Sequence, residues 1–206
     1  MCYRFRMLRV GLTGGIATGK STVSRLFVEC GARLIDADVL ARKAVEPGRP
    51  ACREIAAAFG NEMLRADGSV DRELLGAVVF GDPAKRARLE AIIHPYVFAE
   101  EARLFREITA EDPRAVVLFD AALLIETGAH KRKDRVIVVT AGERTQLRRL
   151  MERNRLTEEE ARRRIRSQMP LAEKATVADY VIDGTLPVEQ LRAEVRRIYE
   201  ELKRLA

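Results

Sequence analysis

The sequence contains, close to its beginning, the stretch Arg9-Val-Gly-Leu-Thr-Gly-Gly-Ile-Ala-Thr-Gly-Lys-Ser-Thr-Val23. Within it, Gly14-Gly-Ile-Ala-Thr-Gly-Lys-Ser21 fits the P-loop pattern of Gly, four residues, Gly, Lys and then Ser or Thr. Residues 8–13 alternate in the manner of a strand, and residues 20–30 carry apolar side chains at helical spacing. Strand, glycine-rich turn and helix form the context that the motif requires. The competing interpretation is a glycine-rich surface turn before a helix.

Each residue type in the motif has a physical role in binding phosphate. Gly14 and Gly19 are expected to adopt positive φ, so that successive backbone N–H groups point into one concave site. The helix that follows contributes its positive dipole end. Lys20 is expected to reach the β- and γ-phosphates, and the Ser21 hydroxyl to ligate Mg²⁺. The stretch therefore predicts a nucleoside triphosphate site.

The composition is that of an ordinary globular α/β chain. The 206 residues are 47% hydrophobic and 33% charged, with a net charge of +6 that suits an anionic substrate or a weak preference for nucleic acid. The absence of Trp excludes a tryptophan-built stacking platform. Cys2, Cys30 and Cys52 show no metal-binding spacing, which favours reduced thiols in a cytoplasmic protein.

Neither a membrane span nor a signal peptide is expected. No run of 18 apolar residues occurs. Residues 1–7 carry two arginines and lead directly into the first expected strand without an apolar core or cleavage site.

The order of expected elements predicts an α/β fold with a parallel sheet covered by helices. Strands are expected at about 8–13, 32–36, 115–120, 135–140 and 180–183, and helices at about 20–30, 39–45, 50–59, 72–80, 84–108, 143–154, 158–168 and from 187 onward. His94-Pro95 is expected to break or kink the long helix 84–108. His94 itself has no Ser or Cys partner and is interpreted as structural. Ligands of such sheets bind beyond the carboxyl ends of the strands.

Two carboxylates are expected at the end of the second strand. Asp36 and Asp38 are two residues apart, so a strand would direct both side chains to one side, toward the phosphate site. Asp38 is the better candidate for the base that orients an acceptor hydroxyl, with Asp36 supporting Mg²⁺ through water. The alternative is that either residue only caps the next helix.

A third carboxylate follows the apolar run 116–119. Asp120 has the Walker-B arrangement, in which a buried strand delivers a carboxylate to the magnesium shell. A helix cap is again the competing interpretation.

The region 144–166 is rich in arginine and includes Arg148, Arg149, Arg153, Arg155, Arg162, Arg163, Arg164 and Arg166. Arginines that close over a triphosphate supply forked donors to developing negative charge. For most of them a solvated helix face paired with Glu158 to Glu160 is the preferred interpretation, and two or three are expected to contact nucleotide.

Short motifs run from the first expected strand to the last: Val10–Val23, Ile35–Arg42 with Val45–Gly48, Ile93–Pro95, Leu123–Glu126, Gln146–Arg149 with Arg153, Arg164–Gln168 with Lys174, and Ala178–Asp183. Together they resemble the dephospho-CoA kinase family. One departure is Ala17-Thr18, where the family usually has Gly-Ser; neither side chain is needed for backbone contacts to phosphate.

The resemblance implies transfer of the ATP γ-phosphoryl group to the ribose 3′-hydroxyl of dephospho-CoA, which gives coenzyme A and ADP and depends on Mg²⁺. This is the last step of coenzyme A biosynthesis. The implied partners are ATP and dephospho-CoA, without a membrane or a specific nucleic acid, and the oligomeric state is left open.

The implied architecture is a P-loop NTPase fold of three α/β/α layers with a five-stranded parallel sheet. It forms a single domain, residues 1–206, with its core at 1–39, 97–152 and 175–206. A helical acceptor-binding insertion is expected at about 40–96 and a lid at about 153–174.

The implied site combines the motif residues with the resemblance. Expected catalytic residues are Asp38, Lys20 and Asp36. Expected ATP-binding residues are Gly14, Gly15, Ile16, Ala17, Thr18, Gly19, Lys20, Ser21, Thr22, Arg149 and Arg153. Expected metal-binding residues are Ser21 and Asp120.

Two rival functions fit parts of the sequence. Another small-metabolite or nucleotide kinase would share the P-loop and would prefer a nucleoside or sugar as acceptor. A nucleotide switch or nucleic-acid-binding ATPase would account for the net charge of +6. The absence of an Asn-Lys-x-Asp guanine-reading motif, and the interleaving of acids among the arginines, disfavour the second rival.

Overall fold

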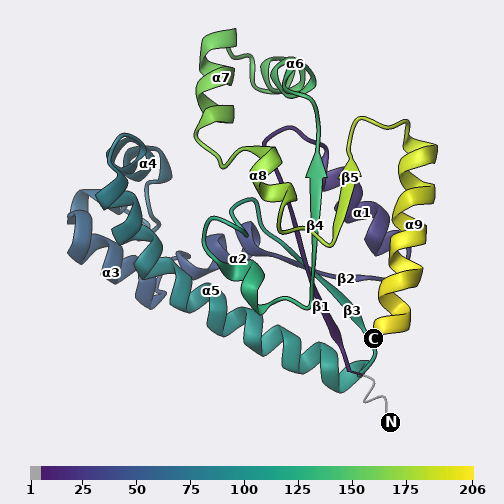
Figure 1. Ribbon diagram of the computed structural model, residues 1–206. Coiled ribbons are helices and arrows are strands. Elements are labelled where there is room, and N and C mark those ends of the chain that lie inside the picture. The colour runs from purple at the N-terminus through teal and green to yellow at the C-terminus, as the bar shows by residue number, and fades with distance from the viewer. Residues whose placement is uncertain (1–5) are drawn as a thin grey trace. The chain divides into compact units, whose positions relative to one another are not determined.

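The computed structural model describes residues 6–206 (Figure 1). Most of the expected N-terminal leader, residues 1–5 with Cys2, therefore lies outside the described residues. The described chain divides into two compact units, one formed by residues 6–35 with Glu107–Ala206 and the other by Asp36–Arg106. The expected division into core, insertion and lid stays a prediction.

The first unit is built on a sheet whose central strand leads into the P-loop. Its strands are β1 (Leu8–Gly14), β2 (Arg33–Asp36), β3 (Val116–Asp120), β4 (Arg135–Thr140) and β5 (Tyr180–Asp183). Across residues 6–206 they form one five-stranded sheet in the order β2-β3-β1-β4-β5, with parallel pairing of β1 to β3, β1 to β4 and β4 to β5. The expected five-stranded parallel sheet is confirmed.

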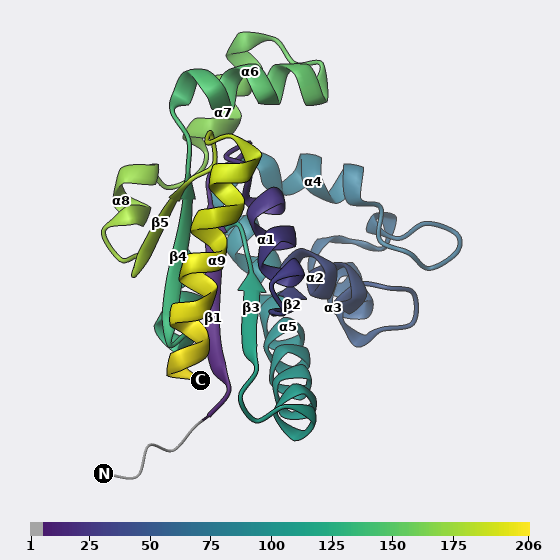
Figure 2. The same ribbon diagram turned by 90° about the vertical axis from the view of Figure 1, so that its right-hand side faces the viewer.

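One face of the sheet is covered by the first and last helices, α1 (Lys20–Glu29) and α9 (Val188–Leu205), which Figure 2 shows side by side. Alternate residues of β1, Val10 and Leu12, are fully buried against them. The apolar stripe of α9 completes this core with Val195, Ile198 and Leu202. Burial of such a stripe is what stabilises an amphipathic helix in water.

The opposite face of β1 is covered by the turn that follows β3. Leu124 is buried and lies directly over Gly11, where an added Cβ would come within 2.5 Å of it. Thr13, on the same face, donates from Oγ1 to Ala122 O at 3.1 Å. The end of β1 and the turn after β3 are therefore packed and hydrogen-bonded together.

The remaining helices of the first unit follow β4. They are α6 (Glu143–Asn154), α7 (Glu158–Arg166) and α8 (Leu171–Ala175), and the short 3-10 helix η2 (Ala129–Arg132) precedes β4. Thr157 and Glu160 form the expected capping box at the start of α7. The Glu160 carboxylate accepts a hydrogen bond from the Thr157 backbone N–H, and this bond lowers the pKa of Glu160 below its usual range. Helix α7 ends at Arg166, so Gln168 lies beyond it rather than inside it as expected.

The second unit is helical. It contains α2 (Ala37–Ala44), α3 (Pro50–Phe59), η1 (Asn61–Met63), α4 (Arg72–Phe80) and most of α5 (Pro83–Glu111). These elements share a core of buried residues: Val45, Ala51, Cys52, Ile55, Met63, Val70 and Leu75.

The expected break at Pro95 is not observed, since α5 continues through this residue. Proline removes one backbone hydrogen bond from a helix. Here Ile92, Ile93 and Tyr96, on both sides of the proline, pack against the same core. This shared packing favours a continuous helix over a break.

None of the helices within residues 6–206 is both long and apolar enough to cross a lipid bilayer.

Candidate active site

The P-loop connects β1 to α1 at the centre of the sheet, where the strand order changes direction. Gly19 caps α1 with φ 101°, a conformation that opposes any side chain with a Cβ. Gly14 does not have positive φ, which corrects the expectation for this residue. Glycine is needed at 14 for another reason: an added Cβ would lie 2.6 Å from Val139 O and 2.9 Å from Thr18 Oγ1.

The first part of the loop, Gly15–Thr18, forms a turn. The Thr18 N–H donates to Gly15 O at 3.3 Å, and Thr18 Oγ1 donates to the same oxygen at 2.9 Å. Ala17 adopts φ 59°, an uncommon conformation for a residue with a Cβ. The fully buried Thr18 side chain thus locks a turn that contains a strained alanine.

The second part of the loop, Gly19–Thr22, presents backbone donors. Within the described part of the chain, the N–H groups of Gly19, Lys20 and Ser21 donate to no protein acceptor, whereas the Thr22 N–H returns to Gly19 O at 2.9 Å. Unsatisfied N–H groups in the first turn of a helix, combined with the helix dipole, form a binding site for anions. This arrangement suits the phosphates of a nucleotide.

Lys20 and Asp120 are partners in the structure. The Lys20 ammonium donates to Asp120 Oδ1, and the two side chains are 20% and 8% exposed. Asp120 ends β3, next to β1 in the sheet. The strand pairing therefore brings the P-loop lysine and Asp120 together, a contact that the sequence interpretation did not include, and the roles of the two residues toward phosphate and Mg²⁺ stay predictions.

The chemistry of Ser21 and Asp120 fits Mg²⁺ held mainly by a nucleotide. Both offer oxygen ligands, which Mg²⁺ prefers. Across residues 6–206, no group of three or more His, Cys, Asp or Glu side chains is arranged to hold a metal ion alone. Mg²⁺ is usually bound through one or two protein oxygens together with substrate phosphates, so this sparse donor set is compatible with it.

A pocket of about 390 Å³ lies beside the P-loop. It is lined by Ala17, Gly19, Ser21, Thr22, Arg149, Arg153, Gly184, Leu186, Val188 and Leu191. Both arginines expected to bind ATP are thus in this pocket. Arg149 Nη1 donates to Thr18 O at 3.1 Å and Nη2 to Gly184 O at 3.0 Å, so its guanidinium joins the P-loop to the turn after β5.

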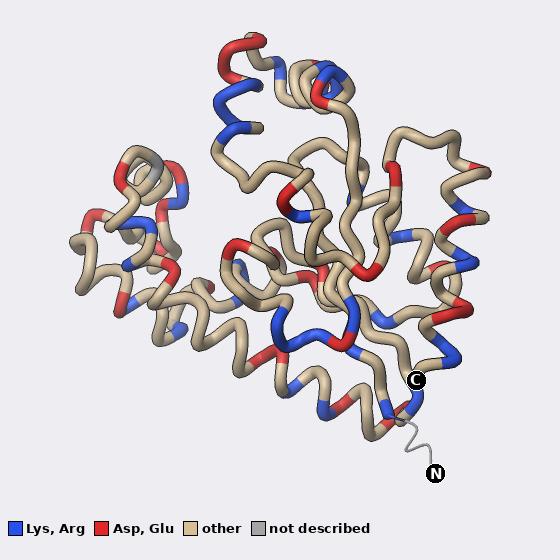
Figure 3. The backbone as a smooth tube through the Cα atoms, viewed as in Figure 1, with Lys and Arg blue, Asp and Glu red and all other residues tan. Residues whose placement is uncertain are grey.

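Arg162, in the same region, has a different environment. Figure 3 shows basic segments along α6 and α7, interrupted by acidic ones. Arg162 donates to Glu158 at 2.6 Å and to Glu143 at 2.8 Å, and the Glu158 hydrogen bond raises the pKa of Arg162. For this residue the paired helix face is the correct interpretation.

Asp36 and Asp38 do not lie on one strand, which corrects the expectation for this pair. Asp36 ends β2 and caps α2, because its Oδ1 accepts the Val39 N–H at 3.0 Å, and Asp38 is exposed in the first turn of that helix. The chain is therefore already helical at Asp38, and strand alternation does not govern its direction. The cap found for Asp36 is the alternative considered above, and the catalytic roles of both residues stay predictions.

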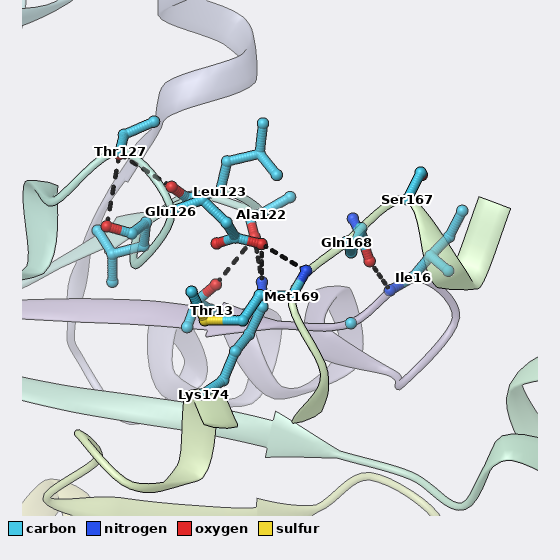
Figure 4. A network of polar contacts seen from close by, with 12 residues as sticks. Thr13, Ile16, Ala122, Leu123, Glu126, Thr127, Ser167, Gln168, Met169 and Lys174 are labelled. Atoms are coloured by element: carbon cyan, nitrogen blue, oxygen red, sulfur yellow. Dashed lines mark hydrogen bonds and ion pairs between the residues drawn. The ribbon is translucent and has the colours of Figure 1, made fainter. Parts of the chain in front are cut away.

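Several polar residues around the P-loop received no role from the sequence. The fully buried Lys174 ammonium lies 2.8 Å from Glu126 Oε1 and donates to Ala122 O at 2.9 Å (Figure 4). Gln146 and Gln168 both hydrogen-bond to Ile16. A signal for them existed: Glu126, Gln146, Gln168 and Lys174 all belong to motifs of the family resemblance.

Comparisons with known proteins point to one family. The family model for dephospho-CoA kinase matches residues 8–188. A dephospho-CoA kinase of Geobacter metallireducens is 48% identical over 95% of this chain and 96% of its own length. A dephospho-CoA kinase of Streptomyces avermitilis is 46% identical over 95% of this chain and 94% of its own length.

Solved structures give the same result. TT1252 from Thermus thermophilus superposes with a TM-score of 0.79 at 33% identity, covering 95% of this chain and 98% of that one. Dephospho-CoA kinase from Campylobacter jejuni has a TM-score of 0.62 at 26% identity, covering 94% and 96% of the two chains. Shikimate kinase from Acinetobacter baumannii, at 19% identity and a TM-score of 0.51, shares the fold alone. From its sequence, its sheet and its P-loop, the chain belongs to the dephospho-CoA kinase family.

Proposed function

We propose that this protein transfers the γ-phosphoryl group of ATP to the ribose 3′-hydroxyl of dephospho-CoA, giving coenzyme A and ADP. The observation that carries the proposal is the P-loop itself. In a chain of this family, three N–H groups without a protein acceptor in the described residues lie beside the Lys20–Asp120 pair and the 390 Å³ pocket. Membership of the family indicates dephospho-CoA as the phosphoryl acceptor, and the P-loop provides the site for the phosphoryl donor, ATP.

The nucleotide is proposed to bind along Gly14–Thr22. The N–H groups of Gly19–Ser21 would bind phosphate oxygens, and Lys20 would exchange part of its contact with Asp120 for the β- and γ-phosphates. Arg149 and Arg153 line the adjoining pocket, where they favour negative charge.

Ser21 and Asp120 are proposed to hold Mg²⁺ together with the phosphates. When bound, the ion neutralises charge on the transferring group and fixes its orientation. The protein supplies one hydroxyl and one carboxylate, which agrees with the preference of Mg²⁺ for few protein ligands at nucleotide sites.

The acceptor is proposed to bind to the second unit. This unit contains a pocket of about 240 Å³ that is largely apolar and includes Arg42 and Arg72 in its lining. An apolar pocket with two guanidinium groups suits a ligand that combines a long organic arm with phosphates. Asp38 is proposed to orient the 3′-hydroxyl and accept its proton, with Asp36 beside it.

Positioning and charge stabilisation should dominate catalysis. The transition state of phosphoryl transfer is loose in most descriptions, so aligning the hydroxyl with the phosphorus contributes more than early proton removal. Lys20 and the pocket arginines would stabilise the charge that develops on the departing ADP.

The role of Asp38 is tested by Asp38→Asn. Loss of a positioned general base lowers turnover by about 100-fold or more, while ATP binding should survive because the P-loop is unchanged. Turnover is measured by coupled ADP release and ATP binding by calorimetry. Unchanged turnover would remove Asp38 from the mechanism.

The acceptor is tested by measuring ADP release with dephospho-CoA against a panel of nucleosides and sugars. A preference for a nucleoside or sugar would contradict the proposed acceptor and leave the kinase assignment standing. Titration with nucleic acid at several salt concentrations addresses the other rival, for which a steep salt dependence is expected. The cytoplasmic location expected from the cysteines stays a prediction.

A further inference from the structure

Two glutamine side chains hold the backbone of Ile16. The Ile16 N–H donates to Gln168 Oε1 at 2.7 Å (Figure 4), and Gln146 Nε2 donates to Ile16 O at 2.7 Å. A backbone N–H can only donate and a carbonyl can only accept. The partners therefore fix the orientation of both amides: Gln168 presents oxygen and Gln146 presents nitrogen.

Ile16 is the second residue of the turn Gly15–Thr18, and the geometry of this turn is a specific one. Of the described non-glycine residues, only Ala17 and Arg155 have positive φ, so the sign change falls between Ile16 and Ala17. A hydrogen-bonded turn with positive φ at its third residue alone is of type II. Types I and II differ in the direction of the central peptide, which here joins Ile16 to Ala17.

The direction of that peptide decides where one donor points. In a planar trans peptide the C=O and N–H groups point in opposite directions, so the bond from Gln146 to Ile16 O also fixes the Ala17 N–H. Within residues 6–206 the Ala17 N–H donates to no protein acceptor, and Ala17 lines the pocket beside the P-loop. Since the Cβ of Ala17 opposes positive φ, the turn needs an external contact to select type II.

Gln168 lies on a segment that is itself anchored. The neighbouring Met169 N–H donates to Glu126 Oε1 at 3.3 Å, and the same oxygen lies 2.8 Å from the buried Lys174 ammonium (Figure 4). Gln146 is 4% exposed on the first turns of α6. Both amides therefore approach Ile16 from fixed parts of the first unit.

We infer that Gln146 and Gln168 are positioning residues for the nucleotide: they hold the Gly15–Thr18 turn in its type II form and so direct the Ala17 N–H toward phosphate. The inference rests on the proposed function only for the identity of ATP. It concerns nucleotide binding, which can be measured without any acceptor.

The test uses one isosteric substitution at three glutamines. Gln168→Glu retains an acceptor oxygen for the Ile16 N–H. Gln146→Glu replaces the donor with a carboxylate that faces Ile16 O. Gln190→Glu, on the exposed face of α9, is the matched control for added charge. Binding of a non-hydrolysable ATP analogue with Mg²⁺ is measured by calorimetry from about pH 5.5 to 8.5, each variant relative to wild type.

The expected result separates the two sites. Gln168→Glu should bind within about threefold of Gln190→Glu at every pH. Gln146→Glu should lose about 10-fold or more at pH 8, because an acceptor is left facing a carbonyl. Binding by Gln146→Glu should recover at low pH, because a protonated carboxyl can donate to Ile16 O. Hydrogen bonding to this neutral form also raises the pKa of the carboxyl. Arg149, which donates to Thr18 O, and the Lys174–Glu126 ion pair beside the Gln168 segment are the same in both variants.

Neutral variants provide a second test in case an introduced charge prevents folding. Gln146→Met and Gln168→Met each remove one hydrogen bond to Ile16, and each should weaken binding of the ATP analogue by about 10-fold. In steady-state assays the KM for ATP should rise while the KM for dephospho-CoA stays constant. Equal behaviour of Gln146→Glu and Gln168→Glu across the pH range, or binding by both Met variants equal to wild type, would overturn the inference.

Discussion

The two parts of the P-loop are held in opposite ways. In the held part, Gly15–Thr18, protein side chains bind the Ile16 N–H and the carbonyls of Ile16 and Thr18. In the donor part, Gly19–Thr22, three consecutive N–H groups bind no protein acceptor among residues 6–206. A phosphate site requires both conditions. The N–H groups must be available to the ligand, and the backbone that carries them must be held in one orientation.

The difference also lies in where the supporting residues come from. The donor part is formed by local sequence, namely glycine at 19 and the first turn of α1. The held part depends on Gln146, Arg149 and Gln168, which are more than 120 residues further along the chain. Local sequence thus forms the donors of Gly19–Ser21, and contacts from distant residues hold the neighbouring turn Gly15–Thr18. Substitutions in the two parts should therefore have different signatures.

The largest effect is expected in the donor part, from Lys20→Ala. Removing the ammonium should lower turnover by about 100- to 1,000-fold, because a charge-stabilising donor at the reacting phosphate is lost. ATP should also bind more weakly. Coupled ADP release and calorimetry measure the two quantities. Turnover close to wild type would show that the donor part does not contact the transferred group.

Lys174→Met should act on the support of the held part. It leaves Glu126, whose side chain is 22% exposed, without its cationic partner and removes a donor from Ala122 O. Loss of the buried lysine, which leaves Ala122 O without this donor and a partly exposed carboxylate without its cation, should reduce the free energy of unfolding by about 1–3 kcal/mol. Chemical denaturation measures this change.

The control for this variant is Lys203→Met, because the Lys203 side chain is 39% exposed. Adding Glu126→Gln to Lys174→Met should restore part of the loss, since the uncompensated carboxylate is removed. Equal stability of Lys174→Met and Lys203→Met would contradict an anchoring role.

Arg149→Lys tests the contact between the held part and the pocket. The guanidinium fork reaches Thr18 O and Gly184 O together, and a lysine ammonium is a single point charge that cannot span both in this way. ATP binding should weaken by about 10-fold, which corresponds to the loss of one or two hydrogen bonds. Arg196→Lys, on an exposed position of α9, is the control, and equal affinities of the two variants would exclude the proposed bridge.

The smallest effect is expected from Ala17→Gly. Glycine relieves a left-handed conformation that costs about 1 kcal/mol. It also loses the methyl contact with the Leu147 and Leu150 cluster, worth about 0.8 kcal/mol, and increases the entropy of the unfolded chain. The net change in the free energy of unfolding should stay below about 1 kcal/mol.

Ala17→Val gives the contrast for this prediction. A β-branched side chain is strongly disfavoured at φ 59°, so the variant should melt clearly below wild type. Glycine and valine variants of equal stability would contradict the conformation described for this turn.

The sequence was sufficient for the sheet, for the glycine-rich loop between β1 and α1 and for the carboxylate at the end of β3. Each follows from a local pattern, since buried strands, glycine spacing and a carboxylate at a strand end depend on neighbours along the chain. The expectation that Asp36 and Asp38 share one strand was wrong, because it too relied on a local pattern. A cap at Asp36 starts the helix one residue after the strand, and alternation cannot reveal where a strand stops.

The held part could not be predicted from pattern alone. Gln146 was quoted only as part of a family motif without a role, and Gln168 was expected inside the helix at 158–168. Its approach to Ile16 depends on α7 ending at Arg166, and helix ends are poorly encoded in local sequence. Lys174 has no apolar pattern that marks it as buried, and its partners Ala122 and Glu126 are 52 and 48 residues away along the chain.

Because Lys174 is completely buried, its amine can be used to follow local opening of the structure. Among the described lysines it alone is fully shielded from solvent, so acylating reagents should modify the others first. It becomes available only while the segment around α8 is detached, and the modified amine can no longer pair with Glu126. The rate of labelling at this residue, measured by mass spectrometry, would therefore report how often the segment opens. Bound nucleotide should lower this rate.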